Sequence, residues 1–144
     1  MAKFTGFLAG GDGHHFEIYD GKGEPLPAAR VFNAYLGLAD RGGRRLSIGM
    51  VGGEEGVPLQ GVYGAASSHT DGGVTVVLNA AELPMRQRSV RVIVPWPSES
   101  KPRVQVGSQD GPSTTATDTN TDSGLCSGVI EIVSGQILVL ELTP

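Results

Sequence analysis

The feature that most limits how this chain can fold is a series of short apolar runs that starts near residue 45. The runs are rich in β-branched residues, are bounded by Gly, Pro, Asp or Ser, and cover residues 45–52, 59–67, 74–80, 89–96, 103–107, 128–134 and 136–143. Glycine, which stands between many of them, supplies 22 of the 144 residues. This is about twice its usual share of roughly 7%. Runs of this length and spacing predict an all-β fold, an antiparallel β-sandwich of about seven to eight strands.

Alternation within three of these runs indicates which side chains form the core. Successive side chains of a strand point to opposite faces of a sheet, so apolar residues at every second position share one face. Nine aliphatic residues follow this rule: Val74, Val76, Leu78, Val90, Val92, Val94, Leu138, Leu140 and Leu142. We predict that these nine side chains fill the space between two stacked sheets.

Two connections have the composition of tight turns. Asp71, Gly72 and Gly73 separate two of the runs, and glycine can take the positive φ angles that a tight hairpin needs. A shorter connection at residues 133–136 separates the last two runs. Both predict antiparallel hairpins. By contrast, residues 106–124 are polar and show no periodicity, which predicts a long loop or a mobile flap.

One segment has the periodicity of a helix. Between residues 28 and 39, five apolar side chains gather on one helical face: Val31, Phe32, Tyr35, Leu36 and Leu38. Pro25 and Pro27 suit the start of this helix, and the two glycines at 42 and 43 suit its end. A strand over residues 14–20 and a turn at residues 20–23 are expected before it.

The predicted elements give the chain two parts. Residues 1–43 would be an N-terminal appendage of strand, turn and helix, and residues 44–144 would be the β-sandwich domain. A chain of 144 residues is long enough for one ordinary domain with a hydrophobic core and too short for two comfortable ones.

Charge and cysteine content exclude several classes of function. The chain carries 11 basic and 15 acidic residues, a net charge of -4, without a block of five like charges. We therefore expect no nucleic-acid partner and no membrane-surface helix. Cys126 is the single cysteine, which excludes an intrachain disulfide and a thiolate-rich metal site.

No apolar stretch has the length of a membrane span, and residues 1–13 lack the pattern of a secretory signal. We expect a soluble chain, and the sequence does not indicate its cellular compartment.

The expected strand, turn and helix at the start resemble part of a known enzyme family. In retaining glycoside hydrolases with a (β/α)8 barrel, a phrase of apolar residues, Asp, Gly, two prolines and Ala commonly precedes the last barrel helix and a C-terminal β-sandwich. The matching residues are Ile18, Tyr19, Asp20, Gly23, Pro25, Pro27 and Ala28. Residues 64–80 resemble a strand, hairpin and strand of such sandwiches, and residues 128–142 resemble their closing hairpin.

The resemblance implies an accessory domain without catalytic activity of its own. The catalytic carboxylates of that family lie on earlier barrel strands, about 5 Å apart in retaining enzymes, and this chain has no room for that barrel. Its partners would be a catalytic barrel domain or carbohydrate. Two alternatives remain: an autonomous carbohydrate-binding module, and a small structural protein that oligomerises through an edge strand or the helix. The sequence offers no acid pair, metal motif or nucleophile motif whose spacing favours an independent enzyme.

Three aromatic residues are the candidate carbohydrate contacts. Sugar-binding modules stack sugar rings on exposed Trp and Tyr side chains and add hydrogen bonds from polar neighbours. Trp96, Tyr63 and Tyr19 are the candidate platforms. Trp96 stands between two prolines, which cannot extend a central strand, so we expect it at a rim or an interface.

A second group of residues suggests calcium. Asp118, Asn120 and Asp122 repeat the start of a calcium-binding loop, whose oxygen ligands alternate in this way. The match then fails, because Ser123 stands where the turn glycine belongs and Val129 where the bidentate acid belongs. A polar flap that binds no cofactor is the competing interpretation.

Overall fold

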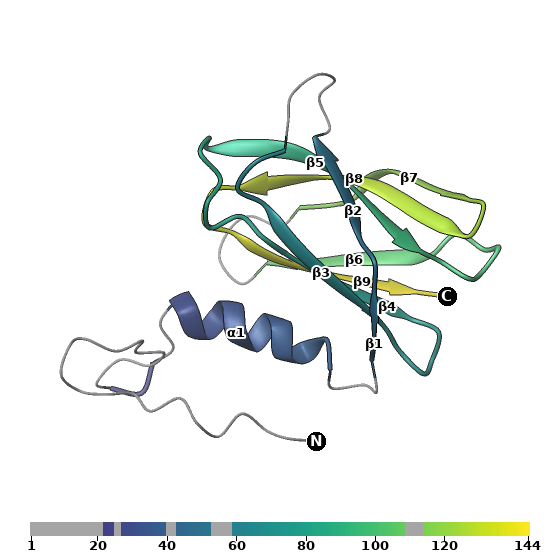
Figure 1. The fold of residues 1–144 in the computed structure, drawn as a ribbon, viewed down its shortest axis with the longest axis horizontal. Coiled ribbons are helices and arrows are strands. Elements are labelled where there is room, and N and C mark those ends of the chain that lie inside the picture. The colour runs from purple at the N-terminus through teal and green to yellow at the C-terminus, as the bar shows by residue number, and fades with distance from the viewer. Residues whose placement is uncertain (1–21, 25–26, 40–42, 53–58, 109–113) are drawn as a thin grey trace. The chain divides into compact units, whose positions relative to one another are not determined.

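The computed structural model describes residues 22–24, 27–39, 43–52, 59–108 and 114–144. Contacts between residues divide the chain into two compact units, Met1–Asn33 and Ala34–Pro144, and each is described by itself. The helix α1 (Pro27–Gly37) spans the division, and all the described strands lie in the second unit (Figure 1).

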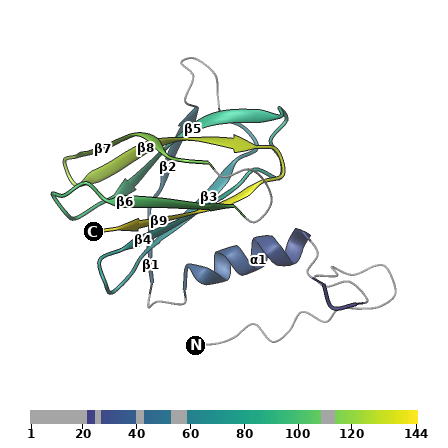
Figure 2. The ribbon, with the colours of Figure 1, turned by 180° about the vertical axis from the view of Figure 1, so that it is seen from behind.

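The nine strands of the described residues form two antiparallel sheets that lie one above the other (Figures 1 and 2). The five-stranded sheet has the order β1 (Arg44–Leu46), β3 (Tyr63–Ser68), β4 (Val74–Asn79), β9 (Ile137–Thr143) and β6 (Arg103–Ser108). The four-stranded sheet has the order β2 (Gly49–Gly52), β5 (Gln87–Pro95), β8 (Leu125–Val133) and β7 (Thr117–Asp122). The predicted all-β sandwich is therefore confirmed.

The core lies between the two sheets and contains all nine predicted residues. None of the nine exposes more than 5% of its surface, and residues from both sheets belong to one apolar cluster. Within the five-stranded sheet, Val76 stands opposite Leu140. Burying an aliphatic side chain of this size stabilises a fold by about 1.5–3 kcal/mol, so these nine account for a large part of the stability of the sandwich.

Two glycine turns were predicted as hairpins, and the first is confirmed. β3 and β4 pair along six residues on either side of the turn at residues 69–73. His69 N–H donates to the Gly73 carbonyl (2.8 Å), Gly72 has a φ of +83°, and the Asp71 side chain accepts from Gly73 N–H (2.8 Å). The turn therefore has the hydrogen bonds and the positive φ that its composition predicts.

The second prediction is wrong, because β8 and β9 belong to different sheets. The turn between them carries the chain from one sheet to the other, with Gly135 at a φ of +81°. Gln136 is buried at this corner: its side-chain oxygen accepts from Val133 N–H (3.0 Å), and its side-chain nitrogen donates to Ser108 Oγ (2.9 Å). The buried amide is thus satisfied by a backbone N–H of β8 and a side chain of β6, which lie in different sheets.

The chain also crosses between sheets near its first predicted run. Residues 45–52 were expected to be one strand, but β1 and β2 lie in different sheets, with Ser47 and Ile48 between them. Gly64 on β3 makes room for this crossing. A Cβ atom there would lie 2.8 Å from Met50 Sδ and 3.2 Å from Ile48 Cδ1.

The predicted loop over residues 106–124 contains a strand, β7, and β6 continues to Ser108. In β7, Thr119 and Thr121 are half-buried whereas Asn120 and Asp122 are exposed, which is the alternation of a strand at the edge of a sheet. The prediction failed because it weighed polarity above the β-branched threonines. The turn after β7 has positive φ at Ser123 and Gly124, as the two-residue hairpin turn of type I′ requires.

The predicted helix over residues 28–39 is confirmed as α1. Pro27 begins the helix, at the position where its missing N–H costs no hydrogen bond and its fixed φ suits the helix. Leu38 and Ala39 N–H groups then donate to the carbonyls three residues earlier, in a tighter final turn. The predicted strand over residues 14–20 lies outside the described residues.

Candidate functional site

Two hollows flank the turn of the β7–β8 hairpin. This hairpin lies at one edge of the four-stranded sheet (Figure 1). The rim hollow, of about 340 Å³, lies between this hairpin and residues 96–99. The face hollow, of about 280 Å³, lies on the outer face of the sheet and includes Ile93 and Asn120. Asp122, Ser123 and Leu125 line both hollows.

Trp96 lines the rim hollow but presents no stacking face. The residue is only 1% exposed, its backbone N–H donates to the Gly124 carbonyl (2.8 Å), and its indole N–H donates to the Ser100 carbonyl (2.8 Å). The ring is therefore a fixed part of the wall. This corrects the sequence-based expectation of a platform at Trp96, because the apolar ring is buried in the core cluster.

The loop that follows Trp96 is held by its own serines. Ser100 N–H donates to Ser98 Oγ (3.2 Å), and the two hydroxyl oxygens lie 2.7 Å apart. Ser98 and Glu99 both line the rim hollow. A loop fixed in this way can hold polar groups in place for a ligand without much further ordering.

The face hollow combines apolar and polar groups. Ile93 and Leu125, the latter 45% exposed, point outward from neighbouring strands, because Val94 and Cys126 beside them are buried on the inner face. Asn120, Asp122 and Ser127 add an amide, a carboxylate and a hydroxyl. Ser123 donates a hydrogen bond to the Asp122 carboxylate (3.0 Å).

Among the described residues, no lysine or arginine lines either hollow, whereas Asp122 and Glu99 contribute acidic groups. Lys101 lies near enough to act on Cys126 but does not line either hollow. Burial raises the pKa of the Cys126 thiol, and the positive charge of Lys101 opposes part of that rise. The thiol is therefore an inert core group at neutral pH rather than a nucleophile.

The candidate calcium ligands Asp118, Asn120 and Asp122 do not surround a common position where an ion could bind. They lie on the strand β7, whereas a calcium loop must curve its ligands around the ion. Asp118 sits at a bulge with a φ of 49°, and its carboxylate forms an ion pair with Arg91 (2.6 Å). Asn120 and Asp122 instead line the face hollow. Within the described ranges, no three His, Cys, Asp or Glu side chains gather as metal ligands.

Tyr63 stands apart from the hollows, on the outer face of the five-stranded sheet. It is 52% exposed, and its hydroxyl donates to the Glu82 carboxylate (2.6 Å). This hydrogen bond, followed by the negative charge of Glu82, raises the pKa of Tyr63. Its ring is open to a ligand, but the structure does not bring it together with Trp96. Tyr19 lies outside the described residues.

Sequence reasoning missed a chain of hydrogen bonds across the five-stranded sheet. Thr75 Oγ1 donates to the Glu141 carboxylate (2.9 Å) and lies 2.5 Å from Nε2 of buried His69. Because the hydroxyl hydrogen of Thr75 goes to Glu141, His69 Nε2 must be the donor in the second bond. A histidine that donates here cannot accept the proton of Thr75, so this group braces the sheet and does not activate a nucleophile. No sequence motif signals it, because register alone brings Thr75 opposite Glu141.

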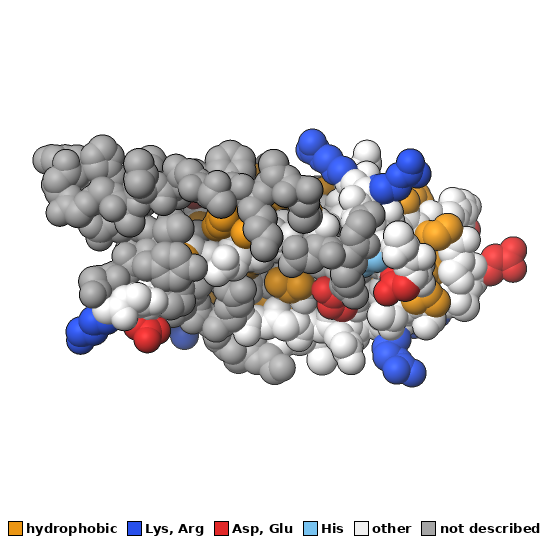
Figure 3. All heavy atoms as spheres, turned by 90° about the horizontal axis from the view of Figure 1, so that it is seen from below, with side chains coloured by type: hydrophobic (Ala, Val, Ile, Leu, Met, Phe, Trp, Pro, Cys, Tyr) orange, Lys and Arg blue, Asp and Glu red, His pale blue; other side chains and the backbone are white. Residues whose placement is uncertain are grey.

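On the uncovered part of the face in Figure 3, basic and acidic side chains are interspersed. No helix in the described part of the chain is long and apolar enough to cross a membrane.

The sequence matches no protein-family model, and neither a curated protein nor a solved structure matches it.

Proposed function

We propose that this chain is a non-catalytic β-sandwich accessory domain of a glycoside hydrolase that contacts carbohydrate beside the β7–β8 hairpin. The observation that carries the proposal is the face hollow, where Ile93 and Leu125 lie beside Asn120, Asp122 and Ser127. The sequence resemblance at residues 18–28 supplies the link to a catalytic barrel.

The chemistry of the face hollow suits a sugar. A sugar ring presents patches of C–H groups, which can cover Ile93 and Leu125, and a rim of hydroxyls, which can bond to Asn120, Asp122 and Ser127. The hollow, at about 280 Å³, is near the lower end of the range of about 300–1,000 Å³ for small-molecule sites. It has room for a short stretch of a glycan.

The rest of the same face supports packing against a neighbouring domain. Val51 is exposed, and Val129 is half-buried on the neighbouring part of the sheet. Arg91, which forms an ion pair with Asp118, stands between these two valines, and Gln87 donates a hydrogen bond to Glu131. Apolar side chains mixed with paired polar groups are typical of interfaces between domains, which are more polar than obligate interfaces. A barrel seated here would hold a glycan close to the hairpin.

Affinity electrophoresis in gels that contain soluble polysaccharides tests the carbohydrate contact. We expect retardation of the native chain on at least one neutral or amino polysaccharide. Asp122→Ala should weaken the affinity by about tenfold, because it removes a charged hydrogen-bond acceptor. Glu131→Ala is the matched control, since it removes an exposed carboxylate from the same strand pair far from the hollow.

Two results would overturn the carbohydrate contact. One is a native chain that no polysaccharide in a broad panel retards, and the other is equal retardation of the native chain and Asp122→Ala. The role as an accessory domain is tested separately by the adjacent coding sequence. A neighbouring frame that encodes a barrel supports it, and its absence favours the autonomous carbohydrate-binding module.

A further inference from the structure

The four edge strands of the sandwich differ in how well they are protected against pairing with another chain. An edge strand offers unpaired backbone groups, and natural proteins block it by making it short, charged or bulged. β1 has three residues, two of them exposed arginines, and β2 has four residues. β7 has a bulge and carries Asp118 and Asp122.

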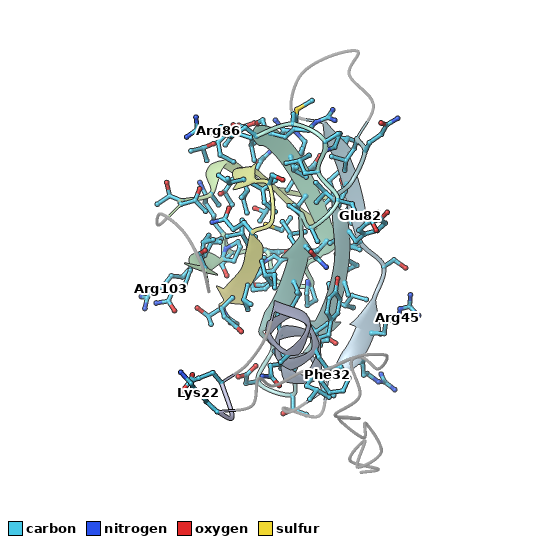
Figure 4. The ribbon with its side chains drawn as sticks, turned by 90° about the vertical axis from the view of Figure 1, so that its left-hand side faces the viewer. Lys22, Phe32, Arg45, Glu82, Arg86 and Arg103 are labelled. Atoms are coloured by element: carbon cyan, nitrogen blue, oxygen red, sulfur yellow. The ribbon has the colours of Figure 1, made fainter. Side chains whose placement is uncertain are left out.

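β6 is the exception among these edges. It pairs with β9 at all six of its residues without a register shift, and its single charged residue is Arg103. Figure 4 shows Arg103 on the side of the five-stranded sheet opposite Arg45 of β1. Among the described strands, none pairs with the other side of β6.

The core is also less completely closed along β6. Val104 and Val106 pack against the core cluster but remain half-buried. An apolar cavity of about 20 Å³ lies behind them, between the two sheets, and is lined by Val104, Ala116 and Leu142 among others. A further strand beside β6 would cover this side of the core.

We propose that β6 of a second copy of this chain pairs antiparallel with β6, so that the two five-stranded sheets become continuous. Residues directly opposite each other in such a pair must point to the same face. The two-fold axis must therefore lie between the two copies of one residue, which stand directly opposite each other. With the axis at Gln105, Val104 faces Val106 of the second copy and Arg103 faces Gly107.

This register explains why a second copy fits the edge. It pairs residues 103–107 and sets the one charged side chain opposite a glycine, so like charges do not meet. An axis at Val104 would draw in Pro102, which has no N–H to donate. An axis at Val106 would set Val104 opposite the polar Ser108. Gln105 is exposed, and in the pair its amide would meet its own symmetry mate.

A cysteine on the two-fold axis tests both the dimer and its register. Gln105→Cys should form a disulfide-linked dimer under mild oxidation, because directly opposite Cα atoms lie about 4.5–5.5 Å apart and disulfides span this distance. Gln87→Cys, on strand β5 of the other sheet, is the matched control and should form no disulfide-linked dimer. The native Cys126 is buried and contributes little background.

Sedimentation velocity across protein concentrations supplies the second measurement. The native chain should sediment as a dimer at high concentration, and Gln105→Lys should sediment as a monomer, because two lysines would face each other at the axis. Gln87→Lys should retain the dimer. A native chain that stays monomeric at millimolar concentration overturns the proposal. So does a dimer that Gln105→Lys leaves intact, since the contact would then lie elsewhere. Neither result bears on carbohydrate binding, which is scored on a separate surface.

Discussion

The turns at residues 69–73 and 134–136 are both built on a glycine, but they lead the chain to different places. Both contain a glycine at positive φ, +83° at Gly72 and +81° at Gly135. The first joins neighbours in one sheet, and the second carries the chain across to the other sheet. The difference lies in the buried Gln136, whose side chain bonds to Val133 and Ser108. The buried His69 beside the first turn bonds to Thr75 within one sheet, whereas the buried Gln136 bonds to both sheets. A glycine thus permits the turn, and the partners of the buried polar side chain beside it mark where the next strand goes.

The largest effect is expected from removal of the Gln136 amide. Gln136→Leu keeps the volume but leaves the Val133 N–H and the Ser108 hydroxyl without this partner, which should lower the free energy of unfolding by about 2–3 kcal/mol. Urea denaturation followed by circular dichroism measures the loss. Gln60→Leu, at an exposed position outside the strands, is the control and should change stability little. If the two substitutions lowered the free energy of unfolding equally, Gln136 would not be what determines the crossing between the sheets.

A smaller and equal effect is expected at the two turn glycines. Gly72→Ala and Gly135→Ala each place an L side chain at positive φ, at a cost of about 1 kcal/mol. Space is not the limit, because a Cβ would lie 3.6 Å from Pro144 at Gly72 and meet nothing within 4 Å at Gly135. Thermal unfolding of both variants should give similar losses. A much larger loss of stability in Gly135→Ala would mean that the backbone conformation of this turn, and not the Gln136 side chain, determines the crossing.

The smallest effect concerns the end of the β3–β4 hairpin that is remote from its turn. The hydrogen bond to Glu82 and then its charge raise the pKa of Tyr63 above 10.0. Since the folded state favours the protonated phenol, the contact stabilises the fold below pH 10, and this contribution is lost as pH rises through the folded pKa. An NMR titration of Tyr63 should show a lower pKa in Glu82→Gln. Glu99→Gln, at an exposed site in another loop, should leave it unchanged, and an unaltered pKa in Glu82→Gln would contradict the role of the contact.

The sequence predicted the layers of this fold better than its connections. The core positions were predictable because period-two alternation in residues such as Val90, Val92 and Val94 has one physical meaning. The hairpin that turned out to be a crossing was not predictable, since partner choice depends on contacts distant in sequence. β7 was missed because its inward residues are threonines, whose β-branched shape was outweighed by their polarity.

The candidate site was predictable only in fragments. Asn120 and Asp122 were singled out for metal binding, and Trp96 for sugar stacking, but the structure makes them walls of adjoining hollows. Ile93, Leu125 and Ser127 were missed, because only the pairing of β5, β7 and β8 brings them to one place. Tyr63 is exposed, and its contact with carbohydrate stays a prediction.

The position of β9 between β4 and β6 has a consequence for synthesis on the ribosome. β9 is the last strand in sequence, yet it supplies the partner of both neighbours. Until residues 137–143 have emerged from the ribosome, β6 has no partner strand, and one side of β4 is unpaired. Pairings between such remote segments form slowly. A ribosome that is still translating would therefore carry an unfinished sheet, whose valines and leucines stay exposed to chaperones until β9 pairs with β4 and β6.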